Sequence, residues 1–157
     1  MLEKLLQQGF DKDTSLSLIN STMILNSNED MYATLDIGIL DLYQGNLESI
    51  KNGACPTFIL RNGEIDKIDC NEIPAGILNN IDLVVYEKDL QDGDLIIMCS
   101  DGVVDNKENE NWLQDVISRI KTNDVQKMAD IIISEAIDAE LGISKDDKTI
   151  IIARIEK

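Results

Sequence analysis

The segment that most constrains the fold is residues 92–105, in which a short apolar run lies between two turn signals. Asp92-Gly93-Asp94 opens it as a turn, because glycine adopts positive φ and the flanking carboxylates can bond local backbone. Leu95–Cys99 is too short for a helix and predicts a strand buried on both faces. Ser100-Asp101-Gly102 ends the strand in a turn whose glycine allows close approach. The carboxylate of Asp101 is therefore predicted at the tip of a buried strand.

A second acidic turn near the other end of the chain supports a functional role for the first. Taken alone, Ser-Asp-Gly is most often a strand-terminating turn with no chemical role. Near the other end of the chain, however, Asp146-Asp147 directly precedes the apolar segment Ile150–Ala153, which predicts another strand. Two strands that each have an acidic tip can face each other. We therefore expect Asp101 and Asp146 to converge closely enough to share one cation.

Composition excludes several classes of function. The 157 residues fit one domain, residues 1–157, and 43% hydrophobic residues suffice for a core. With 14 Lys and Arg against 30 Asp and Glu, the net charge is -16, which argues against a nucleic-acid partner. Such acidity suits divalent cations, although a solvated surface is its commoner cause. The absence of histidine excludes Ser-His, Cys-His and His-metal sites, so any chemistry would use carboxylates.

The cysteines and the hydropathy pattern indicate the redox environment of the chain and its relation to membranes. Three widely spaced cysteines without a Cys-x-x-Cys pair indicate neither a zinc knuckle nor a disulfide framework, and they fit a reducing, cytoplasmic location. Cys99, inside the apolar run, is expected to be a small buried hydrophobe. We find no signal peptide and no apolar run of the ~20 residues that a membrane span needs. No direct membrane contact by this segment is expected.

The order of the elements predicts an α+β fold built on antiparallel strands. Helices are expected over residues 1–9 and 14–25, where Asp11 or Asp13 can cap the second, and over 109–121 and 125–137, where Asp124 can cap the last. Strands are expected over residues 33–43, 47–51, 57–60, 64–68, 83–86, 95–99 and 148–155. A shift of apolar phase within 33–43 favours a bulge or burial on both faces. Asn62-Gly63 predicts a hairpin. The strands-helices-strand order favours two helices packed across one sheet face.

The motifs, in this order and spacing, resemble the end of the metal-dependent serine/threonine phosphatase (PPM) family. The resemblance consists of Asp92-Gly93-Asp94, Ser100-Asp101-Gly102, two helices and then Asp146-Asp147-x-Thr149 before a last strand. Within that family the chain is most similar to the sporulation stage II protein E (SpoIIE) phosphatase domain. Residues 2–12, Ala33-Thr34-Leu35-Asp36 and Pro74-x-Gly76-Ile77-Leu78 also resemble that branch, so the likeness covers nearly the whole chain.

The resemblance implies an αββα antiparallel β-sandwich and a Mn²⁺- or Mg²⁺-dependent phosphatase. The implied substrate is a phosphoserine protein, an anti-sigma-factor antagonist in sporulation. By position, Asp101 and Asp146 match metal ligands of the family, with Gly102 and Asp147 as additional candidates and no further catalytic side chain. Hard cations prefer carboxylate oxygens, and two ions can hold a bridging water as nucleophile. No histidine is needed for that mechanism.

One departure from the family pattern concerns the start of the chain. The bridging Asp-Gly pair of the family has no counterpart upstream of Asp101, and no residue caps the helix that begins at Met1. We therefore expect a domain that is incomplete at its N-terminus, nearly inactive as given, from a parent with upstream segments that include a membrane anchor. The alternative function is a non-catalytic protein-binding domain on the same scaffold. A calcium loop at 105–111 is disfavoured. Lys107 stands at the third position, which needs an oxygen ligand, and Glu110 stands at the sixth, which needs glycine for the sharp turn.

Overall fold

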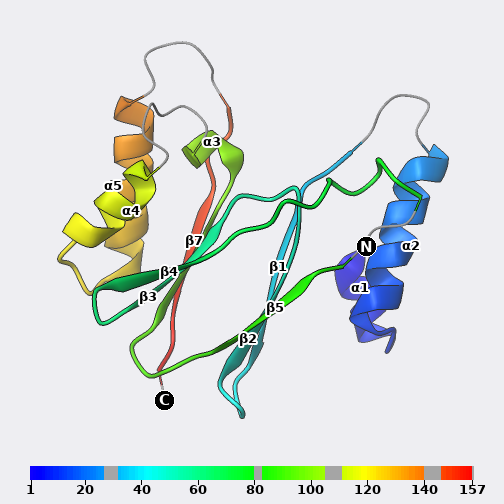
Figure 1. Cartoon of the computed structure of the whole chain (residues 1–157), viewed down its shortest axis with the longest axis horizontal. Helices are drawn as coiled ribbons and strands as arrows, with labels where there is room; N and C mark the ends of the chain where they lie inside the picture. Colours follow the sequence, from blue (N-terminus) through cyan, green and yellow to red (C-terminus); the bar gives the residue numbers. More distant parts are fainter. Residues whose placement is uncertain (27–31, 80–82, 105–110, 140–145, 157) are drawn as a thin grey trace. The chain divides into compact units, whose positions relative to one another are not determined.

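The computed structural model describes residues 1–26, 32–79, 83–104, 111–139 and 146–156, which form two compact units (Figure 1). Unit 1 comprises Met1–Ile39, Glu48–Ala54 and Cys70–Glu87. Unit 2 comprises Leu40–Leu47, Cys55–Asp69 and Lys88–Lys157. Each unit is described separately below. The single domain expected over residues 1–157 stays a prediction.

The elements follow the expected order of helices, strands, helices and a last strand. They are α1 Leu2–Gln7, α2 Lys12–Asn26, β1 Leu35–Asp41, β2 Asn46–Asn52, β3 Thr57–Arg61, β4 Glu64–Ile68, β5 Val85–Asp89, β6 Leu95–Cys99, α3 Asp101–Val104, α4 Trp112–Arg119, α5 Val125–Asp138 and β7 Ile150–Arg154. The strands form a three-stranded sheet, β1-β2-β5, and a four-stranded sheet, β4-β3-β6-β7. No helix of the described residues is long and apolar enough to cross a membrane. The calcium-loop candidate falls mostly outside the described residues.

Local signals in unit 1 are partly confirmed. Of the two candidate caps of α2, Asp11 accepts the backbone N–H of Thr14 at 2.8 Å. Burial of β1 on both faces is wrong, because none of its seven residues is buried. The buried strand of this sheet is β2, which lies between β1 and β5 and whose Lys51 side chain is fully buried. Lys51 is compensated by the carboxylate of Asp36 at 2.6 Å.

A buried asparagine ties α2 to the connection that follows Pro74. Asn20 is 1% exposed, and its Oδ1 accepts the backbone N–H of Gly76 at 2.7 Å. Its Nδ2 donates to the carbonyl oxygen of Leu78 at 2.9 Å. These bonds satisfy backbone groups that no sheet partner serves, so one amide side chain fixes the path of this turn-rich segment.

The sheet of unit 2 is antiparallel throughout. β3 pairs with β4 and with β6, and β6 pairs with β7, each in the antiparallel sense. The predicted hairpin is confirmed, since Asn62 and Gly63 both have positive φ, of 51° and 86°, between β3 and β4. β6 lies inside the sheet, which explains its almost continuous apolar burial.

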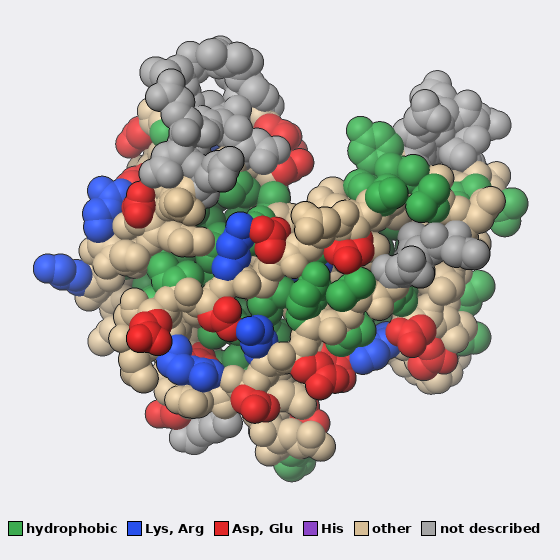
Figure 2. All heavy atoms as spheres, in the orientation of Figure 1, with side chains coloured by type: hydrophobic (Ala, Val, Ile, Leu, Met, Phe, Trp, Pro, Cys, Tyr) green, Lys and Arg blue, Asp and Glu red, His purple; other side chains and the backbone are tan. Residues whose placement is uncertain are grey.

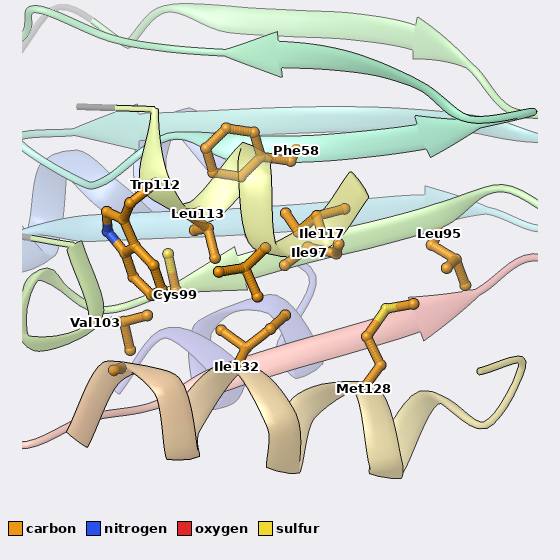
Figure 3. Close-up of a cluster of buried hydrophobic side chains, with 12 residues drawn as sticks. Phe58, Leu95, Ile97, Cys99, Val103, Trp112, Leu113, Ile117, Met128 and Ile132 are labelled. Atoms are coloured by element: carbon orange, nitrogen blue, oxygen red, sulfur yellow. The ribbon is translucent and has the colours of Figure 1, made fainter. Parts of the chain in front are cut away.

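The core of unit 2 lies between this sheet and two helices (Figure 3). Alternate residues of β6, namely Leu95, Ile97 and Cys99, point to the same face. That face is covered by α4 and α5, which contribute Trp112, Leu113, Val116, Ile117, Met128, Ile132 and Ala136. The expectation that two helices pack across one sheet face is therefore confirmed, as is the prediction that Cys99 is a small core residue.

The acidic surface is dispersed. Figure 2 shows Asp and Glu side chains scattered over the visible face and interspersed with Lys and Arg. Several of the charges form exposed pairs, such as Lys67 with Asp69 and Lys88 with Asp66. Exposed pairs of this kind contribute little to stability, and their main effect is solubility.

The N-cap of α5 predicts a pH-dependent stability. Asp124 accepts the backbone N–H groups of Lys127 and Gln126 at 3.2 and 3.1 Å, and the Lys127 bond is the main cause that lowers the pKa of Asp124 below 3.8. A lowered folded-state pKa stabilises the fold above the unfolded pKa, and this contribution disappears as the pH falls through the folded value. Asp124→Ala is expected to lower the melting temperature by a few degrees at pH 7. That difference should shrink below about pH 4.

The matched control at this cap is Asp124→Asn, which retains an oxygen acceptor but does not titrate. Thermal melts from pH 7 to pH 3 should therefore show no cap-linked pH dependence for Asp124→Asn. A difference between wild type and Asp124→Ala that is constant over this pH range would contradict the charge-assisted cap.

An ion pair between a half-buried arginine and a buried aspartate joins β3 to the turn before β6. Asp94 is 1% exposed, and Arg61 binds it through two nitrogens, with Nε to Oδ1 at 2.9 Å and Nη2 to Oδ2 at 2.6 Å. The backbone N–H of Gln91 also donates to Oδ2, at 2.7 Å. The hydrogen bond to Asp94 raises the pKa of Arg61. The two-point contact holds the Asp92-Gly93-Asp94 turn, which opens the central strand, against the neighbouring strand.

Arg61→Leu is expected to lower the melting temperature by roughly 10 °C, because it leaves the Asp94 carboxylate buried without its cation. Lys67→Leu in the same hairpin is the control, since Lys67 pairs with Asp69 where both side chains are exposed, at 43% and 50%. That variant should melt within about 2 °C of wild type. Equal melting temperatures for the two variants would contradict the role assigned to Arg61.

Candidate functional site

Asp101 stands where the central strand of unit 2 ends. The segment was predicted as a turn, but the structure shows a short helix, α3, whose first residue is Asp101. The helix forms because Gly102 and Val103 are buried, which turns the chain back toward the core, and the N–H of Val103 donates to the Ser100 carbonyl at 3.0 Å. The Asp101 side chain is exposed, and its Oδ1 accepts the N–H of Gly102 at 2.9 Å.

Asp146 stands at the same end of this sheet. β6 and β7 are antiparallel neighbours, with Cys99 opposite Ile150. The last residue of one strand therefore lies beside the first residue of the other. The residues that follow Cys99 and those that precede Ile150 share one edge. The exposed Asp146 accepts the N–H of Asp147 through its Oδ1 at 2.9 Å.

Ser100 fastens the two segments together. Its backbone N–H donates to the carbonyl of Thr149 at 3.0 Å, and its Oγ accepts the N–H of Thr149 at 2.9 Å. The same hydroxyl donates to the carbonyl of Asp147 at 3.2 Å. Three hydrogen bonds from one residue thus extend the β6–β7 pairing into the acidic turn. Sequence reasoning missed this role, and the signal for it was a serine at the first position of the predicted turn, directly after the predicted strand.

Gly102 permits the close approach of these segments. A Cβ at this position would overlap the backbone carbonyl oxygen of Asp147 and would lie 3.1 Å from its carbonyl carbon. The carbonyl carbon of Asp146 would be 3.4 Å away. Gly102 is therefore needed for space, and the expectation of a close approach at this glycine is confirmed.

The donors at this edge fit a hard divalent cation in kind. Asp101 and Asp146 offer carboxylate oxygens, which Mn²⁺ and Mg²⁺ prefer. Two carboxylates are fewer than the six ligands of an octahedral ion, so water or further groups would complete the shell. Within the described residues, no group of three or more Asp, Glu, Cys or His could hold a metal ion. That Asp101 and Asp146 share a cation stays a prediction.

Lys148 is a second residue that sequence reasoning did not single out. Its Nζ donates to the backbone carbonyl of Asp146 at 3.3 Å, so its ammonium group lies over the acidic turn. Its position in the motif Asp146-Asp147-Lys148-Thr149 was visible in the sequence. The fold of the turn, which directs the side chain back along its own backbone, was not.

Comparison with known proteins places the chain in a family. Residues 1–156 match the family described as stage II sporulation protein E (SpoIIE). The Bacillus subtilis stage II sporulation protein E is 36% identical over 160 residues, which cover 99% of this chain and 19% of that protein. The chain therefore spans about a fifth of the length of this curated relative.

Solved structures agree with the sequence match. The PP2C phosphatase domain of Bacillus subtilis SpoIIE, solved with a fragment of its regulatory domain, superposes with a TM-score of 0.87 at 36% identity, over 98% of this chain and 47% of that one. The Mn-presoaked phosphatase domain of the same protein gives 0.72 at 34% identity, over 99% of this chain and 71% of that one. The predicted α+β fold with antiparallel sheets is thus confirmed.

Proposed function

This chain belongs to the stage II sporulation protein E family, and from that membership we propose that it forms part of a metal-dependent phosphoserine protein phosphatase. The proposed substrate is a phosphorylated anti-sigma-factor antagonist, so the activity would regulate a sigma factor during sporulation. The proposed cofactor is Mn²⁺ or Mg²⁺, and the proposed location is the cytoplasm. The relatives whose names include a phosphatase domain, one of them presoaked with manganese, support this proposal.

One observation carries the proposal: the start of α3 with Asp101 and the acidic segment with Asp146 are hydrogen-bonded together, through Ser100, at one sheet edge. Ser100 makes the bonds and Gly102 leaves the space. The exposed carboxylates of Asp101 and Asp146 on these adjoining segments are the kind of donor that a hard divalent cation prefers.

In the proposed mechanism the residues of this chain position charge. Asp101 and Asp146 would hold a divalent cation, whose chemistry is to activate a water and to neutralise phosphoryl oxygens. Ser100 keeps the two turns in register, so the carboxylates do not drift apart when a substrate binds. The main-chain carbonyl of Asp147 accepts the hydrogen bond from the Ser100 hydroxyl and lies next to Gly102, so it holds the acidic segment in place. Preorganised charge of this kind is what phosphoryl transfer needs.

We also propose that the 157-residue chain turns over slowly by itself. The two assigned carboxylates can hold one ion weakly, since Mg²⁺ retains most of its waters when few protein ligands are supplied. Two ions that share a bridging water as nucleophile would need more carboxylates than these two. The alternative is a non-catalytic protein-binding domain on the same scaffold.

The test compares two chains with Mn²⁺ and a serine-phosphorylated anti-sigma-factor antagonist: the 157-residue chain, and a longer one that adds upstream sequence. Release of phosphate by the longer chain, abolished by chelation of the metal, is the expected result. Strong turnover by the 157-residue chain would contradict the proposed weakness of its metal site. Binding of the phosphoprotein without turnover by either chain would favour the non-catalytic alternative.

A further inference from the structure

A groove of about 490 Å³ lies between α5 and the start of β7 in unit 2. One wall is a stripe of α5 that runs from Gln126 to Ile137, and the other consists of residues 148–150. Residues three and four apart share a helix face, so the stripe is continuous along α5. In Figure 1, α5 lies beside β7, and the C-terminal end of α5 is at the end of the sheet where α3 begins.

The floor of the groove is aliphatic. Ile133 and Ile150 pack against the core with one side and line the groove with the other. Ile137 lies one helical turn beyond Ile133 and is 53% exposed. An exposed isoleucine next to two half-buried ones offers apolar surface that a bound aliphatic side chain could cover.

Two residues of the groove are hydrogen-bonded to the segments of the candidate metal site. Thr149, which lines the groove, is bonded through its backbone N–H to the hydroxyl of Ser100, the residue before Asp101. Lys148, on the same rim, donates to the carbonyl of Asp146. The rim therefore has a cation at the end next to the two acidic turns. Asp130, a carboxylate, lines the groove one helical turn from Gln126, which is at the far end. Among the lining residues, Lys148 is the cation, so a phosphate is better placed at its end than beside Asp130.

We propose that this groove binds the substrate phosphoprotein next to its phosphoserine. An aliphatic side chain of the substrate lies on Ile133 and Ile137, and the ammonium of Lys148 faces the phosphate. The inference rests on the proposed function, because it takes the phosphate to lie beside Asp101 and Asp146.

The test measures binding of the fluorescein-labelled anti-sigma-factor antagonist to the 157-residue chain by anisotropy, in its phosphorylated and unphosphorylated forms. Ile137→Gln is expected to raise Kd for the phosphorylated form about 10-fold, because a polar side chain replaces apolar contact surface. The control is Ile131→Gln. Ile131 is on the same helix, 39% exposed, and outside the groove, so this variant should bind like wild type. Lys148→Gln should reduce the preference for the phosphorylated form.

The outcomes separate this inference from the function on which it rests. Equal Kd values for Ile137→Gln and Ile131→Gln, with phosphatase activity present in the longer chain, would overturn the groove and leave the proposed function. The expected pattern of Kd values without turnover in either chain would overturn the phosphatase assignment and retain the groove as a protein-binding site. A circular dichroism melt of each variant excludes unfolding as the cause.

Discussion

Asp101→Asn is expected to lower Mn²⁺-dependent dephosphorylation by the longer chain at least about 100-fold. Asparagine keeps the size of the side chain and one oxygen, but it removes the charge that would bind the cation. The Asp101 side chain is exposed, so the substitution should leave the melting temperature nearly unchanged. The measurement is kcat/KM on the phosphorylated antagonist at several Mn²⁺ concentrations, and excess Mn²⁺ should recover part of the activity.

The control for this prediction is Asp92→Asn. Asp92 is an exposed aspartate in the turn at the opposite end of the same strand, β6, so this variant makes the same chemical change away from the site. The activity of Asp92→Asn should equal that of wild type. Full activity of Asp101→Asn would overturn the assignment of residues 92–105 to a metal site.

Gly102→Ala is expected to impair both stability and activity, although the same change within a helix is ordinarily favourable by about 1 kcal/mol. Gly102 is buried in α3, and an added Cβ would meet the carbonyl oxygen of Asp147. Overpacking of this kind costs about 1–3 kcal/mol, which corresponds to a fall of roughly 2–10 °C in melting temperature. Since the clash pushes the acidic turn away from Asp101, turnover should fall further than stability.

The control for Gly102→Ala is Ser118→Ala, at an exposed position of α4 outside the proposed groove. It should melt at or slightly above the wild-type temperature. Thermal melts and Mn²⁺ titrations of activity would be made on both variants. A Gly102→Ala protein that is more stable than wild type would contradict the close approach of the two turns.

Local signals in the sequence predicted much of the fold. Asn62-Gly63 and Asp124 act through their own backbone neighbours, so a short stretch of sequence contains the information for the hairpin and the cap. The burial of Lys51 and the pairing of Arg61 with Asp94 depend on residues 15 and 33 positions away, beyond the reach of local patterns. The apolar run at 83–86 predicts a strand there, but β5 runs from Val85 to Asp89. Its ends are set by pairing with β2 and not by the apolar run.

The candidate site was predictable in its residue types and less so in its assembly. Asp101 and Asp146 were recognisable because each follows or precedes an apolar strand. Their common edge depends on the antiparallel pairing of β6 with β7, which no local pattern specifies. The close approach at Gly102 was predicted from the sequence, but the three bonds of Ser100 and the identity of the segment that approaches Gly102 follow from that pairing and could be recognised only in the structure.

The most direct test of a shared cation is paramagnetic broadening by Mn²⁺ in the ¹⁵N spectra of the 157-residue chain. If Asp101 and Asp146 hold one ion, the amide signals of Gly102 and Asp147 will broaden together, at lower Mn²⁺ than those of exposed acidic segments such as residues 64–66. Both effects should disappear in Asp101→Asn. Broadening of one turn without the other, or broadening of both that persists in Asp101→Asn, would contradict the shared site.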